Sequence, residues 1–204
     1  MKNLKIGQQD EVASTTSTKE RIVQTALTLF KARGLAGVST RDVSEACGLS
    51  RSHLYHYFAD WDALRNGVFT QLSTSEISGA SQQLDALPPA KAMVEFIKAF
   101  LPISRDSSWM LWLDAWDEAL RDDAFAEIYL SAMQQWETVL AAVVQRGVQT
   151  CAFQCDTPER AAKQIFAMIN GYSADLLLVP SPKSQKAAVR DVLEVAALLL
   201  KAEL

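Results

Sequence analysis

Residues 40–58, TRDVSEACGLSRSHLYHYF, combine two short amphipathic segments with a tight turn between them. Val43 is placed to be buried in the first segment, Gly48 permits the chain to turn, and Leu54 is placed to anchor the second segment. The second segment, 51–58, is expected to form a helix roughly 12 Å long, which suits a DNA major groove about 12 Å wide. The stretch therefore predicts a helix-turn-helix.

The rest of the chain also predicts helices. Glycine (8) and proline (6) are scarce among the 204 residues, and every proline follows residue 87. Ser17 and Glu20 have the spacing of a capping box that starts a first helix, and Gly34 suits its C-terminal end. We expect Thr40 to cap the second helix, and Asp60 to cap a fourth helix that runs toward residue 80. Cap and proline signals predict further helices that begin near residues 89, 108, 122, 158 and 182.

Composition and charge limit the class of protein. Hydrophobic residues make up 49% and charged residues 22%, which argues against a largely disordered chain. The net charge is -4, with +2 on residues 1–70 and -6 on residues 71–204, as expected for a small anion-binding module on an acidic body. Three cysteines argue against a disulfide framework, and no stretch reaches the roughly 18 apolar residues of a membrane span. Residues 1–17 are polar, so we expect a flexible arm rather than a signal peptide, and a cytoplasmic protein.

The helix-turn-helix and its surroundings also resemble a known family. Phe30 to Gly34, Thr40 to Ser50 and Leu54 to Phe58 follow in register, over residues 18–69, the pattern of the DNA-binding domain of TetR-family transcriptional repressors. Residues 112–129, WLDAWDEALRDDAFAEIY, are similar to the C-terminal domain of the branch that includes choline-responsive repressors. The resemblance implies an all-α protein of two domains. Residues 18–67 would be a three-helix DNA-binding domain, and residues 68–204 a larger helical domain for ligand binding and dimerisation.

The same resemblance implies roles for individual residues in contact with DNA. The residues that would face base edges, from the first turn of the recognition helix, are Arg51, Ser52 and His53. Those that would mainly contact phosphates are Thr40, Arg41, Tyr55, His56 and Tyr57. Trp61 departs from the family pattern, which usually has a phosphate-binding lysine at this position. Its indole N–H could still donate to a phosphate, but we expect one cation fewer at the DNA surface.

A cluster of tryptophans marks the body of the protein. Trp109, Trp112 and Trp116 recur at i, i+3 and i+7, which places them on one helical face, as part of an ordinary core or as the wall of a ligand pocket. Carboxylates at 114, 117 and 118 could attract a cation to these rings or simply form a solvated face. Between residues 106 and 145 the only Lys or Arg is Arg121, so a buried anion would lack a partner. We therefore expect a neutral or cationic hydrophobic effector in a site lined by Trp109, Trp112, Trp116, Tyr129 and Met133.

The last two helices carry apolar stripes wider than one small body needs to bury, which predicts a homodimer. The residues expected at its interface are Ile165, Met168, Ile169, Tyr172, Leu176, Val192, Leu193, Ala196, Leu199 and Leu200. The residues and the resemblance together predict a homodimeric repressor that a small molecule releases from a near-palindromic DNA operator. An alternative stays open, in which a DNA-binding protein of this fold has no small-molecule inducer and acts in chromosome organisation or through a protein partner.

Signatures of enzymes, metal sites and cofactor sites are missing from the sequence. It contains no Gly-rich phosphate loop and no Ser/His/Asp set in a plausible context. Cys151 and Cys155 are four residues apart, but a metal site needs about four ligands and both histidines lie in the recognition helix. We therefore expect a DNA-binding protein without catalytic activity, metal or cofactor.

Overall fold

The computed structural model describes residues 17–204, so residues 1–16 of the expected N-terminal arm lie outside the described residues. Nine α-helices and no strand lie within this range, which confirms the predicted all-α class. The helices are α1 (Thr18–Arg33), α2 (Thr40–Ala46), α3 (Arg51–Leu54), α4 (Trp61–Asp85), α5 (Pro89–Ala99), α6 (Ser107–Ala119), α7 (Asp123–Gln149), α8 (Pro158–Leu178) and α9 (Pro182–Leu200). None of them is long and apolar enough to cross a bilayer.

Local chemistry sets the ends of the first helices. Ser17 and Glu20 form the predicted capping box, in which each side chain accepts a hydrogen bond from the backbone N–H of the other residue. Gly34 ends α1 with a φ of 77°, a conformation that residues with a Cβ rarely adopt. The expectation that Thr40 caps α2 is wrong, because Ser39 is the cap and closes a capping box of its own. Two hydroxyl residues adjoin there, and the first of them has the extended backbone of a cap.

The second helix of the helix-turn-helix is shorter than predicted. α3 ends at Leu54, whereas the sequence predicted a helix over residues 51–58. Beyond α3 the chain continues in tight turns, in which the N–H of His56 donates to the carbonyl of His53, 3.2 Å away and three residues earlier. Tyrosine and histidine are weak helix formers, and Asp60, six residues after Leu54, already caps α4.

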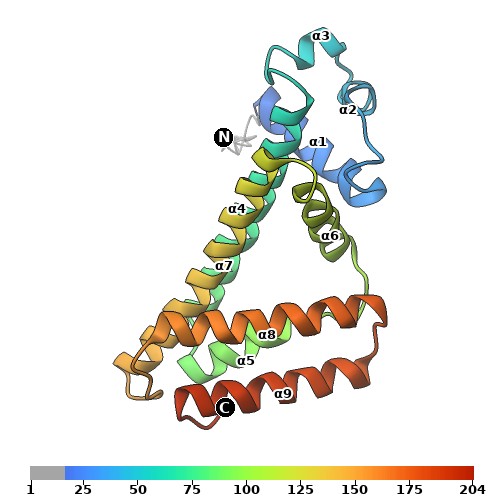
Figure 1. The fold of residues 1–204 in the computed structure, drawn as a ribbon. Coiled ribbons are helices and arrows are strands. Elements are labelled where there is room, and N and C mark those ends of the chain that lie inside the picture. The colour runs from blue at the N-terminus through green and yellow to red at the C-terminus, as the bar shows by residue number, and fades with distance from the viewer. Residues whose placement is uncertain (1–16) are drawn as a thin grey trace, which may run out of the picture.

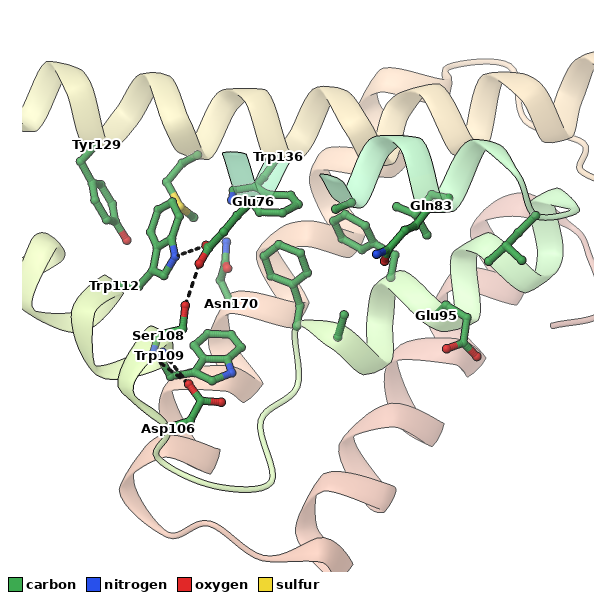
Figure 2. A pocket seen from close by; sticks show the side chains of 17 residues that line it. Glu76, Gln83, Glu95, Asp106, Ser108, Trp109, Trp112, Tyr129, Trp136 and Asn170 are labelled. Atoms are coloured by element: carbon green, nitrogen blue, oxygen red, sulfur yellow. Dashed lines mark hydrogen bonds between the residues drawn. The ribbon is translucent and has the colours of Figure 1, made fainter. Parts of the chain in front are cut away.

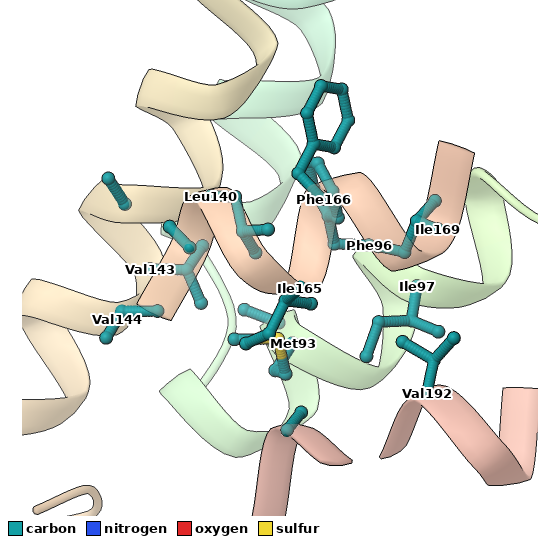
Figure 3. Close-up of a cluster of buried hydrophobic side chains, with 14 of the residues drawn as sticks. Met93, Phe96, Ile97, Leu140, Val143, Val144, Ile165, Phe166, Ile169 and Val192 are labelled. Atoms are coloured by element: carbon teal, nitrogen blue, oxygen red, sulfur yellow. The ribbon is translucent and has the colours of Figure 1, made fainter. Parts of the chain in front are cut away.

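Two clusters of buried side chains lie at opposite ends of the long helices α4 and α7, which run side by side (Figure 1). One cluster joins α1–α3 to α4, α6 and α7, and includes Ile22, Phe30, Leu54, Leu111 and Phe125. The other joins α5, α7, α8 and α9, and includes Met93, Phe96, Leu140, Ile165 and Val192 (Figure 3). Because α4, α6 and α7 pack into the core of the helix-turn-helix, the two ends of the molecule are mechanically connected.

The helix pair α8 and α9 uses most of its predicted interface residues inside the chain. Six of the ten residues expected to meet a partner are buried against α5, α7 or each other: Ile165, Ile169, Leu176, Val192, Ala196 and Leu200. The other four, which keep part of their surface, are Met168, Tyr172, Leu193 and Leu199. The sequence stripe therefore marks mainly the inner face of α8 and α9, because these helices must first close the core of their own chain.

Candidate nucleic-acid interface and ligand cavity

α3 presents an exposed polar surface on a buried apolar anchor. Arg51, Ser52 and His53 are exposed, whereas Leu54 is fully buried in the core of α1–α4. Beyond α3, the ring of Tyr57 stacks on His53 with the ring centres 5.8 Å apart. α3 lies at one end of the molecule (Figure 1), and the three side chains predicted to face base edges are exposed on its single turn.

The start of α2 lies beside α3 and completes this surface. The hydroxyls of Thr40 and Tyr55 are 3.4 Å apart, which brings two predicted phosphate contacts together. Arg41 is exposed but not free, because its Nε lies 2.7 Å from a carboxylate oxygen of Glu45 one turn along the helix. The Glu45 hydrogen bond and charge raise the pKa of Arg41 and offset its positive charge. The surface is therefore less cationic than its arginine content indicates.

Trp61 is the first residue of α4 and packs toward the protein. Its ring meets the ring of Phe30 edge to face, with centres 5.9 Å apart, and the residue is half-buried. A lysine at this position would extend into solvent, whereas the indole ties α4 to α1. A contact between Trp61 and a DNA phosphate stays a prediction.

A cavity of about 480 Å³ lies between α4, α5, α6, α7 and α8. Trp109, Trp112, Tyr129 and Met133 line it, as the sequence predicted for a pocket wall (Figure 2). Trp116 does not line it: the residue is 52% exposed, so its placement in the pocket is wrong. Trp116 lies two turns further along α6 than Trp109, where the inner face of the helix packs on the helix-turn-helix instead.

Several cavity residues were missed, most of them because they come from α4, α8 or the end of α5, whereas Trp136 lies on α7 one turn beyond the predicted Met133. Those that line the cavity without having been predicted include Glu76, Phe96, Phe100, Trp136 and Asn170. Glu76 is the central polar group of this set. One of its carboxylate oxygens accepts from Ser108 Oγ at 2.8 Å, and the other accepts from Trp112 Nε1 at 2.9 Å (Figure 2). Both donors belong to α6, so this carboxylate joins α4 to α6 inside the cavity.

The cavity is acidic and aromatic. Three carboxylates line it, from Glu76, Glu95 and Asp106, and no Lys, Arg or His is among the described residues around it. Asp106 caps α6 through the backbone N–H groups of Ser108 and Trp109, and Glu95 pairs with a lysine on the same helix. Within the described residues Glu76 has no cationic partner, so its charge faces the cavity uncompensated. Burial raises the pKa of the Tyr129 hydroxyl above its usual value.

A buried arginine connects α4 to the junction of α6 and α7. Arg65 is 7% exposed, and its Nη1 lies 2.5 Å from Glu118 Oε1. It also pairs with Asp122, and its guanidinium lies 4.9 Å from the ring centre of Phe125. The backbone N–H of Phe125 and the Arg65 guanidinium hold the pKa of Asp122 below its usual value. This network fixes the start of α4 against the end of α6 and the start of α7.

α6 also touches the end of α1 directly. Asp114 Oδ2 accepts a hydrogen bond from the Leu35 backbone N–H at 3.0 Å. A Cβ at Gly34 would lie 2.6 Å from that same oxygen, so glycine allows the close approach as well as the positive φ. Asp114 is two residues from Trp112, which places the cavity wall and the helix-turn-helix contact on one rigid helix.

Comparison with known proteins assigns the family. Residues 22–68 match the family model described as bacterial regulatory proteins, tetR family, and residues 89–201 match the BetI-type transcriptional repressor C-terminal model. The chain belongs to the TetR family. Its C-terminal part is of the BetI type, and the TetR family consists of DNA-binding transcriptional regulators rather than enzymes.

Individual relatives of this TetR-family chain are distant. It is 27% identical over 93 residues to the HTH-type transcriptional regulator RutR of Escherichia coli (strain K12), a match that covers 46% of this chain and 44% of the relative. The chain thus spans less than half the length of that curated relative.

Two solved structures share the fold of this TetR-family chain. A TetR transcription regulator from Haloarcula marismortui ATCC 43049 superposes with a TM-score of 0.76 at 16% identity, over 90% of this chain and 98% of that one. A putative transcriptional regulator from Saccharomonospora viridis in complex with choline gives 0.66 at 19% identity, over 86% of this chain and 95% of that one. Membership of the TetR family confirms the predicted resemblance, whereas the DNA and ligand contacts of single residues stay predictions.

Proposed function

We propose that this TetR-family regulator is a cytoplasmic homodimer that leaves a near-palindromic DNA operator when a small molecule enters the cavity between α4 and α8. The observation that carries the proposal is the position of α6. Trp112 forms part of the cavity wall, and Asp114, two residues later, holds the backbone of Leu35 at the end of α1. A ligand that displaces Trp112 therefore also shifts Asp114, whose hydrogen bond to Leu35 positions the helix-turn-helix.

The cavity supports a neutral or cationic hydrophobic effector. An anion would be buried beside Glu76 with no cationic side chain lining the cavity, which costs several kcal/mol. Aromatic faces near a carboxylate attract cations instead. The complex of the Saccharomonospora viridis regulator with choline supports the cationic class for a protein of the same fold. A cavity of this size also favours a ligand-responsive regulator over one without an inducer.

Release follows from a shift between two arrangements of the dimer. The ligand binds more tightly to an arrangement in which the two recognition helices are wrongly spaced for successive major grooves, so bound ligand and bound DNA oppose each other. α4 and α6 are the elements that transmit the shift. Both reach the cavity, and the Arg65–Glu118 ion pair joins them near the helix-turn-helix.

The outer face of α8 is the surface that we propose for the partner subunit. Four small or apolar residues recur there at helical spacing and are exposed: Ala167, Gly171, Ala174 and Leu178. Leu178 is 71% exposed, and Leu198 on the neighbouring α9 is 78% exposed. Small residues let two helices approach closely, and the exposed leucines supply apolar surface to bury. Partly exposed members of the predicted stripe, such as Tyr172, border this face.

A release assay tests the proposal. The wild-type protein first selects a duplex from a random pool, and the fluorescence anisotropy of that labelled duplex then reports binding. Cationic and neutral hydrophobic compounds are expected to lower the affinity for the duplex, whereas anions of matched size leave it unchanged. Release by anions alone, or an indifference of the wild type to DNA sequence, would contradict the proposal.

A further inference from the structure

The two ends of the cavity differ in chemistry. Glu76 lies at one end with Ser108, Trp109, Trp112 and Tyr129, and Gln83 and Glu95 lie toward the other end (Figure 2). The remaining cavity residues of α4, α5 and the loop between them are apolar: Ala80, Leu84, Leu87, Phe96 and Ala99. The cavity volume of about 480 Å³ is in the range of pockets that enclose drug-sized ligands. A ligand that fills the cavity therefore places a polar head beside Glu76 and an apolar chain along the apolar side chains of α4 and α5.

The chemistry of the polar end specifies the charge of that head. The Glu76 carboxylate accepts only from two neutral donors, the Ser108 hydroxyl and the Trp112 indole N–H. No cationic side chain lies within 4 Å of it among residues 17–204, and the walls around it are aromatic. A half-buried carboxylate without a counter-ion, enclosed by π faces, is the receptor that a desolvated organic cation requires.

Glu76 also holds two helices together. Its donors lie four residues apart on one face of α6, whereas Glu76 belongs to α4. A cation in van der Waals contact with this carboxylate competes with the donors for its two oxygens. Occupation of the cavity would therefore weaken the hydrogen bonds between α4 and α6, and one of their donors, Trp112, is two residues from the Asp114 contact with the end of α1.

We infer that Glu76 is the residue that recognises the effector, that the effector is a cationic amphiphile, and that binding withdraws Glu76 from Ser108 and Trp112. The inference rests on the effector site proposed above and adds its chemical determinant. It also predicts that a variant with weaker hydrogen bonds between Glu76 and α6 binds cations more tightly. A merely structural role for Glu76 would not predict this increase in affinity.

The first experiment measures ligand binding to the DNA-free protein by the fluorescence of its cavity tryptophans. The probes are choline, its uncharged carbon analogue 3,3-dimethylbutan-1-ol, and hexyltrimethylammonium. Wild type is expected to bind choline at least about tenfold more tightly than the alcohol, and hexyltrimethylammonium at least about tenfold more tightly than choline, because the longer chain buries more methylene groups.

Two variants separate charge recognition from general electrostatics. Glu76→Gln keeps the size and one acceptor oxygen, and is expected to reduce the preference for choline over the alcohol to about threefold or less. Glu127→Gln removes the same charge from an exposed position on α7 outside the cavity, and is expected to leave that preference unchanged. Equal preference in wild type and Glu76→Gln would overturn the assignment of Glu76.

A third variant tests the competition with α6. Ser108→Ala removes one donor to Glu76 without altering any aromatic ring, and is expected to raise the affinity for choline about three- to tenfold while lowering unliganded DNA affinity by a similar factor. Unchanged or weaker binding of choline would overturn the competition.

If cations bind with the predicted dependence on Glu76 yet leave DNA bound, the proposed release fails while the recognition role stands. If cations release DNA equally from wild type and Glu76→Gln, the release stands and this inference fails.

Discussion

The substitution Arg65→Met tests whether the ion-pair network fixes α4 to the junction of α6 and α7. The methionine keeps the length of the apolar stem but removes the charge that pairs with Glu118, Asp122 and the exposed Asp62. Arg65 is 7% exposed, and the side chains of its partners Glu118 and Asp122 are 23% and 27% exposed. The variant therefore leaves two partly desolvated carboxylates close together, with the exposed Arg121, 4.0 Å from Glu118, as the remaining cation.

The expected destabilisation follows from that geometry. Removing one partner of a buried ion pair costs about 3–5 kcal/mol, and the partial exposure of both carboxylates places Arg65→Met at the lower end, about 3 kcal/mol. For a chain of this size each kcal/mol shifts Tm by about 2–4 °C, so Tm is expected to fall by about 6–12 °C. Differential scanning calorimetry at pH 7 measures this shift directly.

The matched control is Arg121→Met. Arg121 pairs with Asp117 and, at the longer distance of 4.0 Å, with Glu118. The Arg121 and Asp117 side chains are 58% and 59% exposed, so the change in stability is expected to stay within about 0.5 kcal/mol. Equal Tm values for the two variants would refute the reasoning, because burial would then make no difference to the value of an ion pair.

The same network predicts the pH dependence of stability. The pKa of Asp122 is lowered in the folded chain, first by the Phe125 N–H and then by Arg65. A carboxyl whose folded pKa lies below its unfolded pKa contributes stability above the unfolded value, and that contribution is lost as pH falls through the folded value. Wild type is therefore expected to lose stability as pH falls below about 4, more steeply than Arg65→Met. Parallel pH profiles of Tm would contradict this assignment.

Three further predictions concern DNA binding and assembly. Arg51→Ala is expected to flatten the preference among operator sequences, whereas Tyr57→Phe weakens all duplexes alike, which binding to a panel of single-base operator variants would distinguish. Glu45→Gln frees the guanidinium of Arg41 and is expected to tighten non-specific DNA binding about two- to fivefold at low salt. Anisotropy titrations are expected to show a steeper salt dependence for this variant. Gly171→Glu is expected to yield monomers in sedimentation, whereas Gly79→Glu stays dimeric, although a Cβ meets nothing within 4 Å at either glycine of the isolated chain; a dimeric Gly171→Glu would remove the α8 face from the interface.

The parts of the fold that local chemistry controls could be predicted from the sequence. The capping box at Ser17, the C-terminal Gly34 and the N-terminal caps Asp60 and Asp122 depend on residues within one turn of each other. The same reasoning placed the cap of α2 one residue too late, at Thr40 instead of Ser39, because serine and threonine are chemically equivalent as caps.

The cavity could be predicted only in part, because it depends on how distant helices meet. The tryptophan spacing located the correct helix, but it gave no means of telling that Trp116 lies beyond the cavity in solvent. No local pattern marks Glu76, because it lies in a polar stretch of α4. Its role depends on two donors, Ser108 and Trp112, which follow it by 32 and 36 residues in the sequence. Likewise, an apolar stripe on α8 indicates burial without telling whether Ile165 meets its own chain or a partner.

The unbroken course of α4 has a consequence for protein engineering. Its 25 residues form one rod about 37 Å long, and Arg65 and Glu76, eleven residues apart, lie within about 20° of the same face. Inserting a single residue between them would turn the far end by about 100° and advance it by about 1.5 Å, so one of the two sites would lose its partners on α6. A chimera that grafts this helix-turn-helix onto another body should therefore be joined within α4 without change of length, and insertions or deletions in this segment are expected to be the least tolerated of the chain.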